Sequence, residues 1–531
     1  MGIAIPVFGG LGLFLYGMDL MGTGLQQAAG DRLKKIIEVL TNNRLMGVLV
    51  GALVTMIIQS SSATTVMVVG FVNAGIMNLS QAVGVIMGAN VGTTVTAQLI
   101  AFNLTDYAPL AIVVGMLILL TASDKKGKDI SDILIGFGIL FIGMDMMGKG
   151  LNPLSQSEIF YNMTLKLRNP YLAAIFGMVL TTVLQSSSAA TGLLQALAGQ
   201  NLIGIDIALP ILFGENIGTT TTAIISSVGA SKTAKRAAVI HFLFNLIGTL
   251  IFMFVLRSFT EGLVLKMSPG NVSRQIANAH TFFNITNVII QFPFASLLVK
   301  AAEKLVPGED EQEGEAKFLD DRIMETPSIA LGFAVKETMR MAQLVEDNIV
   351  KSKQAFVDDD FDEVEDIFKR EEIVDELEKE ITDYVIKLTK KDLTPSQREL
   401  INKLIYITND LERIGDHAEN LAELAQSKQR DGLFFSEDAT MGINDMFEKA
   451  NTVYIKAMES FEKGNKILAQ EAVEIEEEVN QLEKDNKNAH IDRLNQGLCT
   501  TEAGVIYLDA LSNLERVSDH ATNIAKLVMD V

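Results

Sequence analysis

The hydrophobic pattern of residues 1–300 predicts a chain that crosses a membrane several times. A helix needs about 18 or more largely apolar residues to cross a bilayer. Runs of this kind predict crossings at 3–25, 80–102, 107–122, 131–151, 206–228, 237–256 and 277–299. From about residue 326 the apolar positions recur with the helical period between charged ones, which is typical of amphipathic helices. We therefore expect an all-α protein with a polytopic membrane domain followed by a soluble helical domain.

Two further apolar stretches, 46–77 and 171–203, have a polar tetrad near their middle. Both tetrads are Gln-Ser-Ser-Ser, at residues 59–62 and 185–188. The apolar arm on either side of each tetrad is too short to cross a bilayer comfortably. Each stretch is therefore expected to form a re-entrant helical hairpin with the tetrad at its tip.

Three motifs recur at one spacing, which indicates an internal duplication. The segment GLGLFLYGMDLMGTGL from Gly10 matches GFGILFIGMDMMGKGL from Gly136 at 9 of 16 positions, a shift of 126 residues. The two tetrads are also 126 residues apart, as are the motifs GANVGTT and GENIGTT. We expect membrane repeat 1 at 1–126, and membrane repeat 2 with one extra transmembrane helix at 127–300.

Lys and Arg in short loops predict the orientation, since cytoplasmic loops carry an excess of both. Basic residues gather in the 31–44, 124–129 and 229–236 loops, whereas the 103–106 loop has none. Because 103–106 corresponds to 229–232 in the duplication, the two repeats are expected to lie in opposite senses. Inverted repeats with interrupted helices are typical of secondary transporters.

Charge divides the chain into two parts. Residues 1–300 hold 17 Lys and Arg against 12 Asp and Glu, whereas residues 301–531 hold 27 against 53. The acidic second part argues against nucleic acid as a partner. The single cysteine, Cys499, excludes an intramolecular disulfide and suits a reducing compartment. We expect a multi-pass protein of the inner cell membrane with a cytoplasmic C-terminal domain, and no enzyme, because no nucleophile–base constellation or nucleotide loop is present.

The tetrads place three hydroxyls where the second arm of each hairpin begins. Free backbone N–H groups and the positive end of a helix dipole at that point favour an anion. Hydroxyl and Gln carbonyl oxygens also suit Na⁺. The alternative is that these Ser residues only pack and bond to carbonyls, as in many membrane helices; the symmetric repetition favours a ligand site.

The motifs GANVGTTVTAQ and GENIGTTTTAI are expected to interrupt their helices, because Gly and Asn are poor helix formers. Opened carbonyls and Thr hydroxyls would then complete a cation site. Glu215, where the first copy has Ala89, is an intramembrane carboxylate and so a functional candidate; an interfacial position at a helix end is the alternative. His241 and His280 lie on apolar faces and are interpreted as structural.

The segments QSSSATT, GANVGTTVT, QSSSAAT, GENIGTTTTA, HFLFNLIG and AHTFFN resemble, in that order, the type II sodium–phosphate cotransporter family. The resemblance implies Na⁺-coupled transport of inorganic phosphate held between the hairpin tips. The phosphate site that it implies consists of Gln59, Ser60, Ser61, Ser62, Gln185, Ser186, Ser187 and Ser188. The sodium site consists of Gln59, Asn90, Thr93, Thr94, Ser187, Glu215, Asn216, Thr219, Thr220, Thr221 and Thr222. Glu215 stands where the family usually has a small residue.

A second duplication follows the acidic linker 301–325, within the soluble domain at 326–531. LERIGDHAENLAEL from Leu411 aligns with LERVSDHATNIAKL from Leu514. EEIVDELEKE aligns loosely with EEEVNQLEKD, and the pattern fits two three-helix bundles. The Glu-x-x-x-Asp spacing puts two like charges on one helical face, which favours a divalent metal there; a solvated acidic face is the alternative. The tail is similar to the PhoU family of phosphate-signalling proteins, whose two three-helix bundles hold multinuclear metal clusters. The metal ligands predicted in this way are Glu371, Asp375, Glu412, Asp416, Glu476, Glu515 and Asp519, with Asn480 in the second copy where the first has Asp375.

The sequence thus predicts a sodium-coupled phosphate symporter that works by alternating access and carries a cytoplasmic regulatory domain. Its expected ligands are inorganic phosphate, Na⁺ as the coupling ion, the lipid bilayer, and a divalent or iron-type metal cluster in the tail. A second copy of the chain or a phosphate-signalling partner would bind through the tail. Two alternatives remain, a membrane-tethered phosphate sensor without net transport and a transporter or exporter of another oxyanion.

Overall fold

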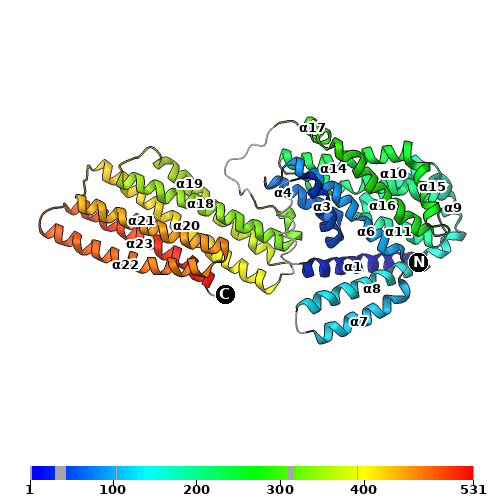
Figure 1. The fold of residues 1–531 in the computed structure, drawn as a ribbon, viewed down its shortest axis with the longest axis horizontal. Coiled ribbons are helices and arrows are strands. Elements are labelled where there is room, and N and C mark those ends of the chain that lie inside the picture. The colour runs from blue at the N-terminus through cyan, green and yellow to red at the C-terminus, as the bar shows by residue number, and fades with distance from the viewer. Residues whose placement is uncertain are drawn as a thin grey trace. The chain divides into compact units, whose positions relative to one another are not determined.

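The structure is a computed structural model that describes residues 3–29, 43–102, 104–122, 125–308, 316, 318–391 and 393–529. The chain forms two compact units, residues 1–311 and 312–531. Every regular element in the described ranges is helical (Figure 1). The predicted all-α class is confirmed.

The first unit contains the membrane helices and both polar tetrads. Its first copy comprises α1 (Ala4–Ala29), α3 (Arg44–Ile58), α4 (Ser61–Asn73), α5 (Leu79–Gly92), α6 (Thr94–Ala101) and α7 (Ala108–Thr121). Its second copy comprises α8 (Lys125–Leu151), α9 (Glu158–Leu167), α10 (Pro170–Leu184), α11 (Ser187–Gly199), α12 (Ile205–Gly218), α13 (Thr220–Ser226) and α14 (Lys232–Ile251). A π-helical segment leads to α15 (Arg257–Met267), and α16 (Val272–Gln291) and α17 (Ala295–Leu305) follow.

The predicted hairpin breaks are confirmed at both tetrads. Helix α3 ends at Ile58 and α4 begins at Ser61, and α10 ends at Leu184 and α11 begins at Ser187. The arms have 15 and 13 residues in both copies. Since an α-helix rises 1.5 Å per residue, each arm is only about 20 Å long and too short to cross the hydrocarbon core.

The corresponding helices α1 and α8 pack side by side through glycines (Figure 1). A Cβ on Gly10 would lie 2.6 Å from the Gly143 carbonyl oxygen, and a Cβ on Gly17 would lie 2.6 Å from that of Gly136. Gly136 is the counterpart of Gly10, and Gly143 is the counterpart of Gly17. The contact is therefore reciprocal and antiparallel, with small residues that let the two backbones approach closely.

A second close packing occurs once in each copy, between α3 and α5 and between α10 and α12. A Cβ on Gly88 would lie 2.0 Å from the Val48 carbonyl oxygen, and a Cβ on its counterpart Gly214 would clash with that of Ala174. The first arm of each hairpin is thus held against the helix that carries the Gly-x-Asn-x-Gly motif. This packing positions the tetrads relative to those motifs.

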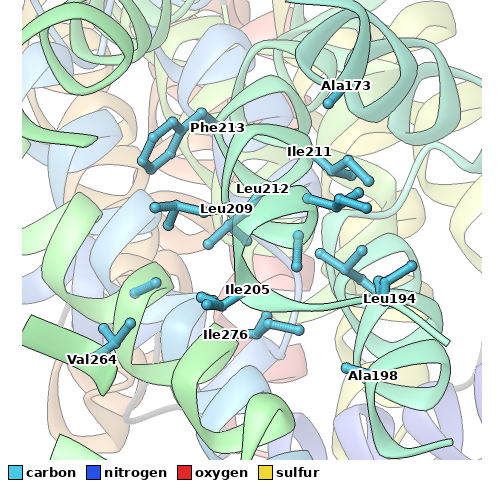
Figure 2. Packing of buried hydrophobic residues seen from close by; sticks show 14 of the residues in the cluster. Ala173, Leu194, Ala198, Ile205, Leu209, Ile211, Leu212, Phe213, Val264 and Ile276 are labelled. Atoms are coloured by element: carbon cyan, nitrogen blue, oxygen red, sulfur yellow. The ribbon is translucent and has the colours of Figure 1, made fainter. Parts of the chain in front are cut away.

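Buried apolar side chains of the second copy and of α15 and α16 form a hydrophobic cluster (Figure 2). Leu209, Leu212 and Phe213 of α12 lie at its centre, with Leu194 of α11 and Ile276 of α16 around them. The cluster fixes α11 and α12 against one another.

Five helical stretches are long and apolar enough to cross a membrane, within the described residues. They are Ala4–Ala29, Leu79–Ala101, Lys125–Gln156, Lys232–Met267 and Val272–Leu305. The predicted crossing 107–122 is a shorter apolar helix. The predicted crossing 206–228 is not among the five, although the corresponding stretch Leu79–Ala101 of the first copy, which Thr93 divides in the same way, is.

One bend before the second hairpin was not predicted from the sequence. Helices α9 and α10 meet at an angle of 111°, either as a broken span or as a re-entrant loop. Asn169 and Pro170 lie at the bend, where Asn169 caps α10 by accepting hydrogen bonds from the backbone of Tyr171 and Leu172. Pro at the first position of a helix is favourable, and it forces the preceding residue out of the helical conformation.

The second unit consists of two three-helix bundles, as predicted. The first comprises α18 (Pro327–Val357), α19 (Val364–Leu388) and α20 (Pro395–Arg430). The second comprises α21 (Glu437–Lys463), α22 (Lys466–Asn495) and α23 (Thr501–Met529). Helices α20 and α23, the counterparts in the two copies, pack against each other between the bundles.

Two sequence predictions fall on residues outside the described ranges. They are the basic residues Arg32, Lys34 and Lys35, which helped to predict orientation, and most of the acidic run in the 301–325 linker. Within that linker α17 continues to Leu305, and a 3₁₀ helix spans Asp321–Glu325.

Candidate functional site

Each hairpin tip has the same backbone conformation. Gln59 and Gln185 end their helices in the left-handed region, with φ of 59° and 52°. The next residues, Ser60 and Ser186, are extended, with φ of −142° and −145°. A left-handed non-glycine residue costs conformational energy and clusters at functional sites. The same two conformations recur at equivalent positions, so the two tips share one backbone structure.

The two tips also leave the same groups free. The side-chain oxygens of Ser60 and Ser186 cap the second arms by accepting from the backbone N–H of Ala63 and Ala189, at 3.1 and 3.2 Å. The next two hydroxyls of each tetrad form no side-chain hydrogen bond within the described residues; they belong to Ser61, Ser62, Ser187 and Ser188. The first backbone N–H groups of a helix have no partner inside it. Each tip therefore offers hydroxyl and backbone donors at a helix N-terminus, the arrangement that binds phosphate.

The two glutamines differ in their surroundings. Gln59 is 5% exposed, and its side-chain oxygen accepts a hydrogen bond from the Thr96 hydroxyl at 2.8 Å. Its amide nitrogen donates to the Met56 carbonyl. Gln185 is exposed, and among the described residues its side chain forms no such bond with Thr222, the counterpart of Thr96. The first tip is closed against α6, and the second is open at the same point.

The helices are divided at Thr93 and Thr219, directly after the Gly-x-Asn-x-Gly motifs. Both residues keep helical dihedral angles and donate their N–H to the carbonyl four residues earlier, so the predicted unwinding is not seen. The amide nitrogens of Asn90 and Asn216 donate to the carbonyls four residues earlier, both at 2.8 Å. This leaves each Asn carbonyl oxygen as the atom available for a ligand. The hydroxyls of Thr94, Thr219, Thr220 and Thr222 likewise donate to backbone carbonyls. A hydroxyl that donates in this way keeps oxygen lone pairs that suit a cation.

Glu215 connects the second helix break to the second hairpin. It is 2% exposed, and its Oε2 accepts a hydrogen bond from the Thr191 hydroxyl of α11 at 2.8 Å. Its Oε1 is buried and has no hydrogen-bond partner in the described part of the chain. The side chain therefore lies inside the unit and not on its surface.

A polar cavity of about 420 Å³ lies beside the second hairpin. Gln195 of α11 lines it together with Asp145 of α8 and Asn271 before α16. Gln195 lies eight residues beyond Ser187, which is about 12 Å along a helix. The cavity therefore reaches to about two turns of α11 from the tetrad.

In the second unit, the first bundle brings three of the predicted metal ligands together. Carboxylate oxygens of Glu371 and Asp375 on α19 and of Asp416 on α20 all lie within 4.8 Å of one another. Glu371 is buried, and its Oε1 has no hydrogen-bond partner in the described part of the chain. Burial, followed by the Asp375, Glu419, Asp416 and Glu412 carboxylates, raises the pKa of Glu371 to about 7. Such oxygen groups suit a divalent or first-row cation, which would relieve their repulsion.

Glu412, the fourth predicted ligand of this bundle, borders the cluster without joining the set of three. Its Oε2 is buried without a hydrogen-bond partner in the described ranges and lies 3.5 Å from Arg413 Nε. Burial and then Asp416 raise its pKa.

The second bundle does not form an equivalent group of three within the described residues. Asn480 stands in place of Asp375 and donates its side-chain amide to Glu476 Oε1 at 2.5 Å. Burial is the main cause that raises the pKa of Glu476 and of Glu515, and Asp519 adds to both. An amide that donates to a carboxylate takes up one potential ligand atom, so this copy is the weaker candidate.

Two histidines next to the acidic motifs join the bundles. His520 Nδ1 lies 2.8 Å from Asp410 Oδ1, and His417 Nδ1 lies 2.8 Å from Asn513 Oδ1. Asp410 and Asn513 are counterparts in the two copies, as are the histidines, whose rings stack at 5.8 Å. These contacts join α20 to α23.

Sequence reasoning missed Thr96, Thr191 and Glu419 as neighbours of the predicted site residues. Thr96 and Thr191 lie inside the duplicated motifs, but their contacts join helices that are distant in sequence. The signal that was available for Thr191 is its position four residues after Ser187, on the same face of α11.

The Na⁺/Pi-cotransporter family model matches this chain twice, at residues 13–149 and 142–265. The PhoU domain model also matches twice, at residues 338–425 and 443–528. Both paired matches agree with the two duplications. A solved structure, PhoU from Pseudomonas aeruginosa, is matched with 21% identity and a TM-score of 0.36, over 39% of this chain and 97% of that chain.

Curated relatives are similar to this chain over different lengths. YjbB of Escherichia coli, named for inorganic phosphate export, is 24% identical over 526 residues, 98% of this chain and 96% of YjbB. The rat sodium-dependent phosphate transport protein 2A is 23% identical over 47% of this chain and 60% of its own length. YqeW of Bacillus subtilis is 30% identical over 298 residues, 55% of this chain and 95% of YqeW. The chain is therefore a membrane protein that belongs to the Na⁺/Pi-cotransporter family and carries a PhoU domain at its C-terminal end.

Proposed function

We propose that this protein transports inorganic phosphate together with Na⁺ by alternating access, and that its C-terminal domain regulates transport from the cytoplasm. The observation that carries the proposal is the pair of identically built hairpin tips, each with free serine hydroxyls at a helix N-terminus. An anion between the two tips would accept hydrogen bonds from the serine hydroxyls of both. The proposed phosphate ligands are the two tetrads, 59–62 and 185–188.

The sodium part of the proposal draws on the oxygens beside the tips. The carbonyl oxygens of Asn90 and Asn216 are left open because both amide nitrogens are in use. Hydroxyls of Thr93, Thr94, Thr219, Thr220, Thr221 and Thr222 adjoin the same two helix breaks. A cation there would offset the charge of phosphate, so that each ligand favours binding of the other.

Alternating access is supported by the difference between the copies. Equivalent residues of an inverted repeat exchange their environments when the protein changes the side to which it opens. Gln59 is closed onto Thr96, whereas Gln185 is exposed. The reciprocal packing of α1 on α8 supports the pseudo-two-fold relation that such an exchange needs.

The PhoU domain would hold a divalent or iron-type metal at Glu371, Asp375 and Asp416, with Glu412 beside it. A metal there would join α19 to α20 and set the rigidity of the first bundle. The proposal assigns this unit regulation, through a second copy of the chain or a phosphate-signalling partner.

Net export of phosphate is the second candidate, favoured by the similarity to YjbB over 98% of this chain. The same site serves both directions, since the gradients of Na⁺ and phosphate decide the net flux. Phosphate flux in proteoliposomes separates the two candidates. The flux is measured with and without phosphate inside the vesicles, and with the Na⁺ gradient inward or reversed. Import requires uptake that follows the inward Na⁺ gradient. Efflux that is independent of Na⁺ would contradict the symport mechanism and support export.

A further inference from the structure

Helix α6 is bonded to both hairpins through two adjacent residues. The Thr96 hydroxyl donates to Gln59 Oε1 at the first hairpin tip, at 2.8 Å. The carbonyl oxygen of Ala97, the next residue, accepts a hydrogen bond from Gln195 Nε2 at 3.1 Å. Gln195 lies on α11, the second arm of the second hairpin. A helix of eight residues therefore joins the tip of one hairpin to the arm of the other.

The Gln195 side chain takes part in this contact as a donor. It is 2% exposed, and its Nε2 also donates to the Ser273 carbonyl oxygen in the first turn of α16, at 3.4 Å. Two carbonyl acceptors fix the orientation of the amide, because a reversed amide would bring its oxygen against both. Its Oε1 is buried without a hydrogen-bond partner in the described part of the chain, which costs free energy. The side chain therefore stabilises this arrangement through its two donated bonds.

Helix α6 is also held directly by α16. Gln98 Nε2 donates to Asn278 Oδ1 at 3.2 Å and to Thr281 Oγ1 at 2.9 Å. The Arg274 guanidinium lies 4.1 Å from the centre of the Phe102 ring, directly after α6. Since the second hairpin and α6 both bond to α16, the three helices hold one another in place.

The equivalent crossing between the copies has different contacts. The arm α4 of the first hairpin packs against α13 of the second copy, as α11 packs against α6. Val69 takes the place of Gln195, and a valine side chain cannot donate a hydrogen bond. The Thr222 hydroxyl, equivalent to that of Thr96, donates to the carbonyl oxygen of Thr219 at 3.0 Å. In the described structure α6 therefore has two bonds to the hairpins that its counterpart α13 lacks.

We propose that Gln195 is a positioning residue of the transport cycle, which holds α6 in the place from which Thr96 closes the Gln59 tip. The inference rests on the proposed transport by alternating access and adds a link between the two hairpins. When the second hairpin moves, Gln195 leaves the Ala97 carbonyl, α6 is released, and the first tip loses its bond. Gln195 acts at a distance from the phosphate site, because it lies about 12 Å along α11 from Ser187.

Hydrogen exchange of the full-length protein tests this link without a measurement of transport. The backbone amides of Gln59 and Thr64 are hydrogen-bonded at the first tip, so their exchange reports its opening. Gln195→Met keeps the length of the side chain and removes the donors, and is expected to speed exchange in peptides from 55–65 several-fold. Leu197→Met on the same helix is the control, because it removes no donor. Unchanged exchange at the first tip in Gln195→Met would overturn the proposal.

A double variant separates the link from a general loss of packing. Thr96→Val removes the bond to Gln59. If Gln195 acts on the tip through Thr96, Gln195→Met should cause no further acceleration in the Thr96→Val background. Accelerations that add in the double variant would contradict the link.

A second variant weakens α6 from its other side. Gln98→Met removes the two bonds from α6 to α16 and keeps Gln195 itself, so it can be used even where Gln195→Met does not fold. It is expected to speed exchange at the first tip as well. A first tip that exchanges at the wild-type rate in Gln98→Met would contradict the role of α6.

Phosphate uptake in proteoliposomes distinguishes failure of this link from failure of the transport proposal. Gln195→Met is expected to lower the maximal rate several-fold with little change in the KM for phosphate, because the side chain positions a helix and does not bind the substrate. If exchange responds as expected and the wild type takes up no phosphate, the transport proposal fails and the link stands. If the wild type transports phosphate and neither the exchange nor the maximal rate responds to Gln195→Met, the link is wrong.

Discussion

The Gln59 side chain accepts a hydrogen bond from Thr96 at 2.8 Å, and this bond has no equivalent between Gln185 and Thr222 in the described structure. The bond connects the tip of the first hairpin to the helix that follows the first Gly-x-Asn-x-Gly motif. It also buries Gln59 while Gln185 stays exposed. The tips of the two hairpins therefore differ in their surroundings.

This difference predicts unequal chemical accessibility of the two tips. In a Cys499→Ser background, Gln185→Cys should react with a water-soluble maleimide at least about tenfold faster than Gln59→Cys, because an opening free energy of ~1.4 kcal/mol slows a reaction by that factor. Labelling rates of the purified protein, followed by mass spectrometry, measure this. Equal rates would contradict the closed first tip.

Serine hydroxyls at the tips are predicted to bind phosphate. Ser61→Ala and Ser187→Ala should each raise the KM for phosphate by about 10-fold to 100-fold, since a hydrogen bond to a charged group contributes ~1.5–3 kcal/mol. Thr121→Val is the control, because its exposed hydroxyl only donates to a carbonyl of its own helix. A KM unchanged in both serine variants would show that phosphate binds elsewhere.

The two bundles of the soluble unit allow an internal comparison of metal binding. Asp416→Asn should abolish binding of Mn²⁺ to the first bundle, because it removes one of three carboxylates that converge within 4.8 Å. Asp519→Asn, the equivalent change in the second bundle, should leave that binding in place. Elemental analysis of the full-length protein after equilibration with Mn²⁺ gives the stoichiometry. Equal loss in both variants would contradict the assignment to the first bundle.

Protonation of Glu371 predicts how pH affects the metal-free soluble unit. Its pKa is about 7 in the folded protein, above the ~4.3 of an unfolded Glu. The folded state thus holds the proton more tightly, and the stability gained in this way is present at acidic pH and is lost as pH rises through about 7. Glu371→Gln should therefore stabilise α19 and α20 at alkaline pH.

Hydrogen exchange in the presence of a chelator measures that effect. Peptides from α19 and α20 should exchange a few-fold more slowly in Glu371→Gln than in the wild type at alkaline pH, and the difference should vanish at mildly acidic pH. Peptides from α22 in the second bundle serve as the internal control. A difference that is largest at acidic pH would have the wrong sign for this account.

The helix breaks could be predicted from the sequence, because they depend on the residues at the break itself. Gln59 and Gln185 interrupt apolar runs, and Gly, Asn and Thr weaken the helices near Thr93 and Thr219. Both breaks recur at the same spacing in the second copy, so each copy supported the prediction made for the other. The acidic pair of Glu371 and Asp375 could be placed on one helix face for the same local reason.

Contacts between distant segments could not be predicted in this way. The bonds of Gln59 to Thr96 and of Thr191 to Glu215 depend on how helices pack in three dimensions. The bend between α9 and α10 lies at Asn169 and Pro170, and its angle of 111° depends on how the two helices pack.

Phosphate uptake driven by a Na⁺ gradient is the most direct test of the central claim. Proteoliposomes that contain the full-length protein, with an inward Na⁺ gradient, should accumulate labelled phosphate above the outside concentration. Replacement of external Na⁺ by choline, or a double Ser61→Ala and Ser187→Ala variant that remains folded, should abolish accumulation. Equal uptake in Na⁺ and choline, or full uptake by the double variant, would contradict the account.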